Sequence, residues 1–109
     1  MADFYIAQGD RLASISIPCT LSDGTVLDLT DAEDLVFRFR LADRSRPGRS
    51  GTPVVVGEAT DGVLRYDWEV GDTDVPGLYL GRWTVTDADG KEFSFPNNGY
   101  TTIEVSRDP

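Results

Sequence analysis

The chain has 109 residues, a formal net charge of −9, no histidine and a single cysteine, Cys19. This length predicts one domain, residues 1–109 with a short tail at 107–109, and it allows a core that needs no disulfide or metal. The acidic charge argues against a nucleic-acid-binding domain, because such domains neutralise phosphates. A lone cysteine excludes an internal disulfide and favours folding in a reducing cytosol.

Apolar and polar residues alternate along most of the chain, as in half-buried β-strands, and no segment of ten or more residues has a helical period. Cys19 lies on the inward set of a long strand. Pro18 lies on its outward set, which places this strand at a sheet edge or at a bulge. The stretch 42–52, rich in Arg, Ser, Gly and Pro, predicts an exposed loop. Strands are predicted at residues 4–6, 12–21, 26–29, 35–41, 54–59, 63–70, 78–86, 91–95 and 100–106.

Large aromatic residues lie on the inward faces of the sixth and seventh predicted strands. The period of two places Tyr66, Trp68 and Val70 on one face, and it places Tyr79 and Trp83 together in the next strand. Core packing is therefore favoured over a sugar-binding platform, which would need these rings at the surface.

The segment around Tyr79 carries the most specific fold signal. Gly77 and Tyr79 follow an aspartate-rich loop in the pattern of a tyrosine corner, where a phenol hydroxyl bonds to upstream backbone at a crossover between two sheets. Gly81 stands where antibody domains have a cysteine, and it is expected to leave room for a large neighbour across the sheets. Asp-Ala-Asp-Gly at 87–90 predicts a hairpin turn. These features predict an all-β fold, an immunoglobulin-like β-sandwich of about seven to nine short antiparallel strands.

No pattern in the sequence supports catalysis, so the chain is not expected to be an enzyme or to hold a cofactor or metal. It lacks a nucleophile elbow, a phosphate loop and zinc-ligand spacing, and the absence of histidine removes the commonest general base. Cys19 is interpreted as a small buried hydrophobe. Asp87 and Asp89 precede a glycine as in a calcium loop, but the flanking ligand positions cannot supply carboxylates. Asp72 and Asp74 are expected to cap loop amides rather than hold a cation.

One basic segment interrupts the acidic chain. Residues 38–49 contain five arginines and one aspartate, a local charge of +4, so the remainder carries −13. Arg44, Arg46 and Arg49 have two interpretations, which the sequence leaves open. Either they belong to a solvated loop that pairs with aspartates at the same end of the domain, or they dock on an acidic patch of a neighbouring subunit. A second candidate contact surface comprises Phe95, Asn97, Asn98 and Tyr100.

Seven short motifs follow one another along nearly the whole chain. They are Asp-Phe-Tyr-Ile-Ala-Gln-Gly-Asp at 3–10, Leu-Asp-Leu-Thr-Asp-Ala at 27–32, Val-Phe-Arg-Phe-Arg at 36–40, Gly-Val-Leu-Arg-Tyr-Asp-Trp at 62–68, Asp-Thr-Asp-Val-Pro-Gly-Leu-Tyr at 72–79, Asp-Gly at 89–90 and Phe-Pro at 95–96. In this order they resemble the immunoglobulin-like domain of bacteriophage tail and baseplate proteins, the type found at the N-terminus of baseplate upper proteins.

This resemblance implies a virion structural protein of the tail, the baseplate or the capsid surface, folded in the host cytoplasm before assembly. The implied partners are other virion structural proteins, and self-association is a further expectation; no nucleic acid, membrane or small-molecule substrate is expected. No apolar run long enough to span a membrane and no apolar leader is present, so a soluble chain is expected. The alternative, from another class, is a carbohydrate-binding module for adsorption to the host surface.

Overall fold

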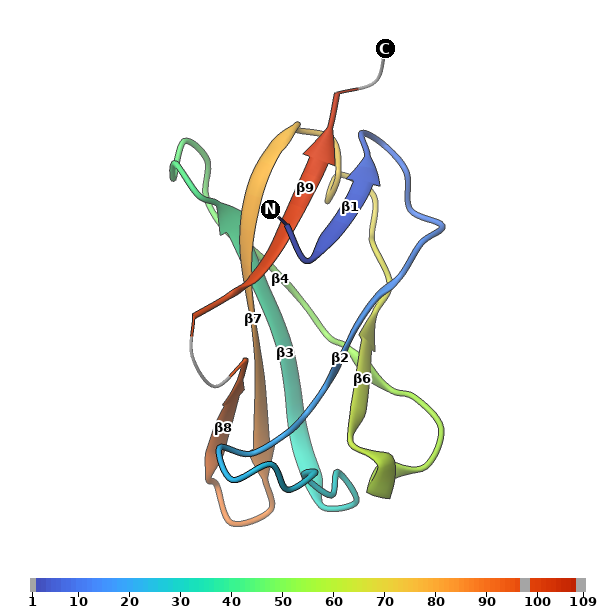
Figure 1. The fold of residues 1–109 in the computed structure, drawn as a ribbon, viewed down its shortest axis with the longest axis vertical. Helices are drawn as coiled ribbons and strands as arrows, with labels where there is room; N and C mark the ends of the chain where they lie inside the picture. Colours follow the sequence, from blue (N-terminus) through green and yellow to red (C-terminus); the bar gives the residue numbers. More distant parts are fainter. Residues whose placement is uncertain (1, 97–98, 108–109) are drawn as a thin grey trace.

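Two long antiparallel strands, β3 (Ala32–Leu41) and β7 (Gly77–Asp87), run side by side through the centre of the molecule (Figure 1). The computed structural model describes residues 2–96 and 99–107. Within these residues the chain is nearly all β, which confirms the predicted all-β class. The other elements are β1 (Phe4–Ala7), β2 (Ile15–Pro18), β4 (Arg49–Gly51), β5 (Val54–Val55), the 3-10 turn η1 (Ala59–Asp61), β6 (Val63–Tyr66), β8 (Glu92–Phe95) and β9 (Thr101–Ser106).

The strands form two sheets. The larger sheet has the order β1-β9-β7-β3-β4, with β8 also paired to β7, and the smaller sheet has the order β2-β6-β5. Every paired couple of named strands is antiparallel except β1 and β9, which run parallel. The expectation of antiparallel strands is therefore wrong for this couple. A hairpin forces the two strands it joins to run antiparallel. β1 and β9 come from opposite ends of the chain and are not joined by a hairpin, so they can pair in parallel.

The core lies between the two sheets and is built around aromatic rings. Phe37 on β3 is fully buried, with its ring centroid 4.2 Å from that of Trp83 and 5.1 Å from that of Tyr66 on the smaller sheet. Trp68 is also buried, so the predicted inward placement of these aromatics is confirmed. A Cβ on Gly81 would lie 2.8 Å from the Phe37 ring. The large neighbour therefore sits on the adjacent strand of the same sheet, not across the sheets as expected.

The corner and the hairpin that flank β7 both form. The hydroxyl of Tyr79 donates a 2.7 Å hydrogen bond to the carbonyl of Val75, upstream in the preceding loop. Gly77 has a φ of 145°, and a Cβ there would lie 2.7 Å from Leu41. At the other end of β7, a carboxylate oxygen of Asp87 accepts the backbone N–H groups of residues 89 and 91 and closes the turn to β8.

Several predicted strands are shorter than expected. Residues 12–21 contribute only β2, and Leu12 is 95% exposed. The strand predicted at 63–70 ends at Tyr66, and Val70 is 75% exposed rather than inward. Residues 26–29 form only one bridge, between Thr20 and Val26. β2 does lie at the edge of its sheet, as Pro18 predicted.

The stretch 42–52 is also more ordered than the loop that was predicted. Its last part forms β4, which pairs with β3 so that Arg38 faces Ser50 and Phe39 faces Arg49. Only residues 42–48 therefore connect the two strands. This pairing decides which arginines of the basic segment point outward and which point inward.

Candidate binding surface

Three arginines gather on the outer face of the larger sheet. Phe37, Phe39 and Leu41 point into the core, so Arg38 and Arg40, which alternate with them on β3, point outward. Arg82 points outward from β7 for the same reason, since it lies between two buried residues. The register pairs Arg38 directly with Arg82.

These arginines line a shallow hollow of about 410 Å³. The neighbouring Ser50 contributes a hydroxyl from β4, and Leu80 and Tyr100 contribute apolar surface. Phe39, Gly48 and Arg49 also line the hollow, and the name basic hollow is kept here for the other six residues: Arg38, Arg40, Ser50, Leu80, Arg82 and Tyr100.

The guanidinium groups of the basic hollow have no carboxylate partner among the residues that the structure describes. Arg40 donates to the carbonyl of the next residue at 3.3 Å, and its guanidinium lies 5.7 Å from the centre of the Tyr100 ring. Arg82 donates to the carbonyl of Gly99 at 2.6 Å. Like charges directly opposite each other on neighbouring strands are destabilising. The basic hollow is therefore a site where a bound anionic group would relieve repulsion.

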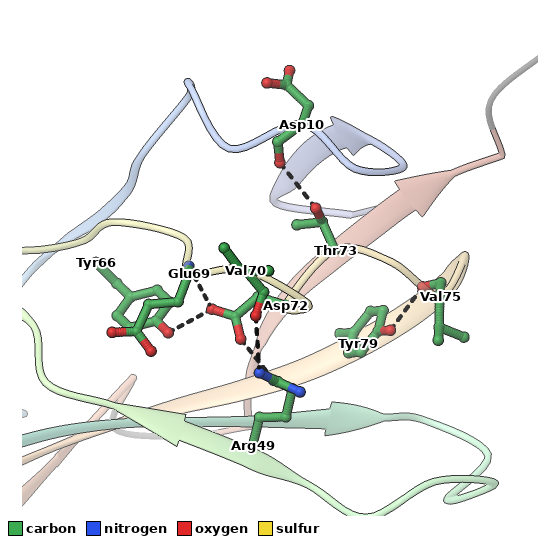
Figure 2. A network of polar contacts seen from close by, with 9 residues as sticks. All are labelled: Asp10, Arg49, Tyr66, Glu69, Val70, Asp72, Thr73, Val75 and Tyr79. Carbon is green, nitrogen blue, oxygen red and sulfur yellow. Dashed lines mark hydrogen bonds and ion pairs between the residues drawn. The ribbon is translucent and has the colours of Figure 1, made fainter.

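A second polar cluster lies near the ends of β4 and β6 (Figure 2). The carboxylate of Asp72, 3% exposed, accepts the Tyr66 hydroxyl at 2.6 Å, the Glu69 backbone N–H at 2.9 Å and Nε of Arg49 at 2.6 Å. Arg49 also donates to the carbonyl of Val70 at 3.4 Å. Burial, with the hydrogen bond to Asp72, raises the pKa of Tyr66 well above its ordinary value. This Asp72 network ties a strand of the larger sheet to the end of the smaller one.

The Asp72 network resolves one of the open alternatives. The connection after Leu41 and the loop that holds Asp72 lie at the same end of the domain, as expected. Arg49 pairs with Asp72 inside the domain. For Arg49 the structure shows the first alternative, pairing within the domain, although about half of its side chain remains exposed. Docking of Arg49 on a partner stays an untested prediction. Arg44 and Arg46 are exposed in the 42–48 connection, without an ion-pair partner within the described part of the chain.

The second predicted surface is only partly at the exterior. Phe95 is 1% exposed, and its inclusion was wrong, because it lies opposite Trp83 on the inward face of β8. Tyr100 is 47% exposed and borders the basic hollow. Asn97 and Asn98 lie outside the described residues. Sequence reasoning missed Arg82, although its alternation with buried neighbours was a usable signal.

Other candidate chemistry finds little support in the geometry. Burial raises the pKa of the Cys19 thiol to about 11, which keeps it protonated at neutral pH. No three His, Cys, Asp or Glu side chains of residues 2–96 and 99–107 lie close enough to hold a metal ion. Over the same residues, no helix has the length and apolar character needed to cross a membrane.

Comparison of the chain with protein-family models, with curated proteins and with solved structures finds no match in any of the three. The function is therefore argued from the surface itself.

Proposed function

We propose that the chain is a non-catalytic structural protein of a bacteriophage particle, with an immunoglobulin-like sandwich fold. The strand orders support the fold proposal. In variable-type immunoglobulin domains one sheet contains strands G, F, C and C′ and the other contains B, E and D. β9, β7, β3 and β4 correspond to the first set, and β2, β6 and β5 to the second. The hydrogen bond from Tyr79 at the start of β7 is the matching corner contact.

The observation that carries the function is the basic hollow. Three arginines that have no carboxylate partner among the described residues share one sheet face of a chain whose net charge is −9. Arginine binds carboxylates through a planar fork of donors, so this face suits an acidic surface of another protein. The chain binds other virion subunits through this hollow, as a tail or baseplate component or as a decoration of the capsid surface.

A carbohydrate-binding role has weaker support. The aromatic residues that could form a sugar platform, Tyr66, Trp68, Tyr79 and Trp83, are all buried. Tyr100 presents a partly exposed ring beside the basic hollow, and the half-buried Phe93 borders a separate hollow. These four buried rings therefore offer no surface on which a sugar could stack.

The proposal is tested by recovery from purified particles. Mass spectrometry of separated capsids and tails should find the chain in one fraction at a fixed ratio to the main subunit. The double variant Arg38→Thr, Arg82→Thr should be incorporated less than wild type while melting no lower, because it removes a like-charge pair. The matched control is Arg65→Thr on the smaller sheet, which loses only an exposed pair with Asp67. Absence of the chain from particles, or equal incorporation of both variants, contradicts the proposal.

A further inference from the structure

The acidic charge of the chain is concentrated at one end of the molecule. This acidic end comprises the 20–31 connection, the first residues of β3, the turn η1 and the β7–β8 hairpin, which lie together at the bottom of Figure 1. Pairing of Ala32 with Asp87, and a hydrogen bond from Leu29 to Ala59, join these segments. The carboxylates of the acidic end are Asp23, Asp28, Asp31, Glu33, Asp34, Glu58, Asp61, Asp87, Asp89 and Glu92.

The net charge of the acidic end equals the net charge of the whole chain. Its ten carboxylates are accompanied by Lys91 alone, which gives −9, and the rest of the sequence carries nine acidic and nine basic residues. All ten carboxylates belong to exposed residues except Asp87, which is half-buried. The molecule is therefore polar along its 44 Å long axis, with an acidic end and a basic hollow.

The two features cannot neutralise each other within one molecule. Asp34 lies four residues before Arg38 on the same face of β3, which corresponds to about 13 Å along a strand. Both residues are fixed by pairing with β7, so the strand cannot bend to bring them together. A second copy can supply the acidic groups that the first copy holds out of reach.

We propose that the acidic end of one copy docks in the basic hollow of the next copy, so that the chain associates head to tail. Carboxylates of the acidic end meet the guanidinium groups of Arg38, Arg40 and Arg82 in this contact. Two different surfaces are joined, so the contact is heterologous, and a docked pair keeps one free acidic end on one copy and one free hollow on the other. Repetition gives a ring if the rotation closes and an open chain if it does not. The inference rests on the proposed function only in using the same hollow as a docking site.

The ionic strength at which this contact forms follows from the charges. Two copies with net charge −9 repel each other at long range, so very low salt disfavours association. At about 0.1 M salt the Debye length is about 10 Å, which screens distant charges but not ion pairs in contact. At about 1 M salt the length falls to about 3 Å and the contact itself weakens. Association is therefore expected at intermediate salt and is lost at high salt, whereas an apolar contact would persist.

The experiment is sedimentation equilibrium of the purified full chain, up to the millimolar concentrations that weak contacts need. The average mass should rise above 12.0 kDa with concentration at about 0.1 M salt and return to it at about 1 M salt. Two variants then separate the two surfaces. The hollow variant is Arg38→Thr, Arg82→Thr. The end variant is Asp31→Asn, Glu33→Gln, Asp34→Asn, Glu92→Gln.

Each variant alone should remain a monomer under conditions where the wild type associates, because every copy has one weakened surface: the end variant loses four of ten carboxylates and the hollow variant loses two of three arginines. Mixed together, they should form a complex limited to one copy of each, with twice the monomer mass, since the hollow variant keeps its acidic end and the end variant keeps its hollow. Equal melting temperatures show that both variants are folded. A wild type that stays monomeric at every salt, variants that self-associate, or a mixture that stays monomeric overturns self-docking. Virion incorporation is measured separately, so a monomeric protein whose hollow variant fails to enter particles leaves the proposed function standing.

Discussion

Replacement of Asp72 should be among the most destabilising single changes in this chain. Asp72→Ala removes the acceptor of the Tyr66 hydroxyl, the Glu69 backbone N–H and Arg49 Nε. The Tyr66 hydroxyl is buried, and loss of its partner costs about 1–3 kcal/mol. The Arg49 side chain is 49% exposed, so water replaces its bond and that part contributes only about 0–1 kcal/mol. The expected loss of unfolding free energy is therefore about 1–4 kcal/mol.

Urea denaturation followed by tryptophan fluorescence measures this loss, because both tryptophans are buried. Asp72→Asn, which keeps the shape and one acceptor oxygen, should fall between wild type and Asp72→Ala. The matched control is Asp74→Asn, an exposed neighbour whose carboxylate makes no hydrogen bond or ion pair within the described residues, and it should change stability by less than about 0.5 kcal/mol. A double-mutant cycle with Tyr66→Phe should give a coupling of at least about 0.5 kcal/mol. If Asp72→Ala is no worse than Asp74→Asn, or the coupling is zero, the Asp72 network does not hold the sheets together.

Three further changes have definite expected results. Tyr79→Phe leaves the Val75 carbonyl without its donor and should lower stability by about 1–3 kcal/mol; an unchanged urea midpoint would exclude a stabilising corner. Gly81→Ala forces a Cβ to within 2.8 Å of Phe37 and should cost about 1–3 kcal/mol, part of which Phe37→Leu should restore in a melting assay; full stability of the single variant would refute this crowding. Stability should fall as pH rises from 9.0 towards about 11, because folded Cys19 keeps a proton that the unfolded chain loses; the same slope in Cys19→Val would assign the effect to other groups.

The sequence predicts the centre of the larger sheet well and its margins poorly. β3 and β7 each pack one face on the core along most of their length, so apolar and polar residues alternate without interruption. Strand length at the margins depends on the partner. β2 pairs only with β6, and the four residues of β6 limit it to residues 15–18, although alternation continues on both sides. Alternation reports which face a residue prefers, and it does not report where the partner strand stops.

The same limit applies to the arginines. Alternation alone places Arg38 and Arg40 outward and would also have placed Arg82 outward. Two facts depend on register, which no local pattern encodes: the direct opposition of Arg38 and Arg82, and the inward direction of Arg49. The arginines of the single basic segment 38–49 therefore belong to two separate features of the structure. One is the unpaired basic hollow, and the other is an arginine committed to the Asp72 network.

β4 connects these two features. Arg49 reaches inward from this strand to Asp72, and the next residue, Ser50, points outward into the basic hollow opposite Arg38. β4 is only three residues long and lies at the edge of its sheet, so backbone pairing with β3 gives it limited support. The ion pair between Arg49 and the buried carboxylate of Asp72 holds β4 in place as well. The Asp72 network therefore fixes one wall of the basic hollow, so the shape of the proposed docking face is set within the domain without a disulfide.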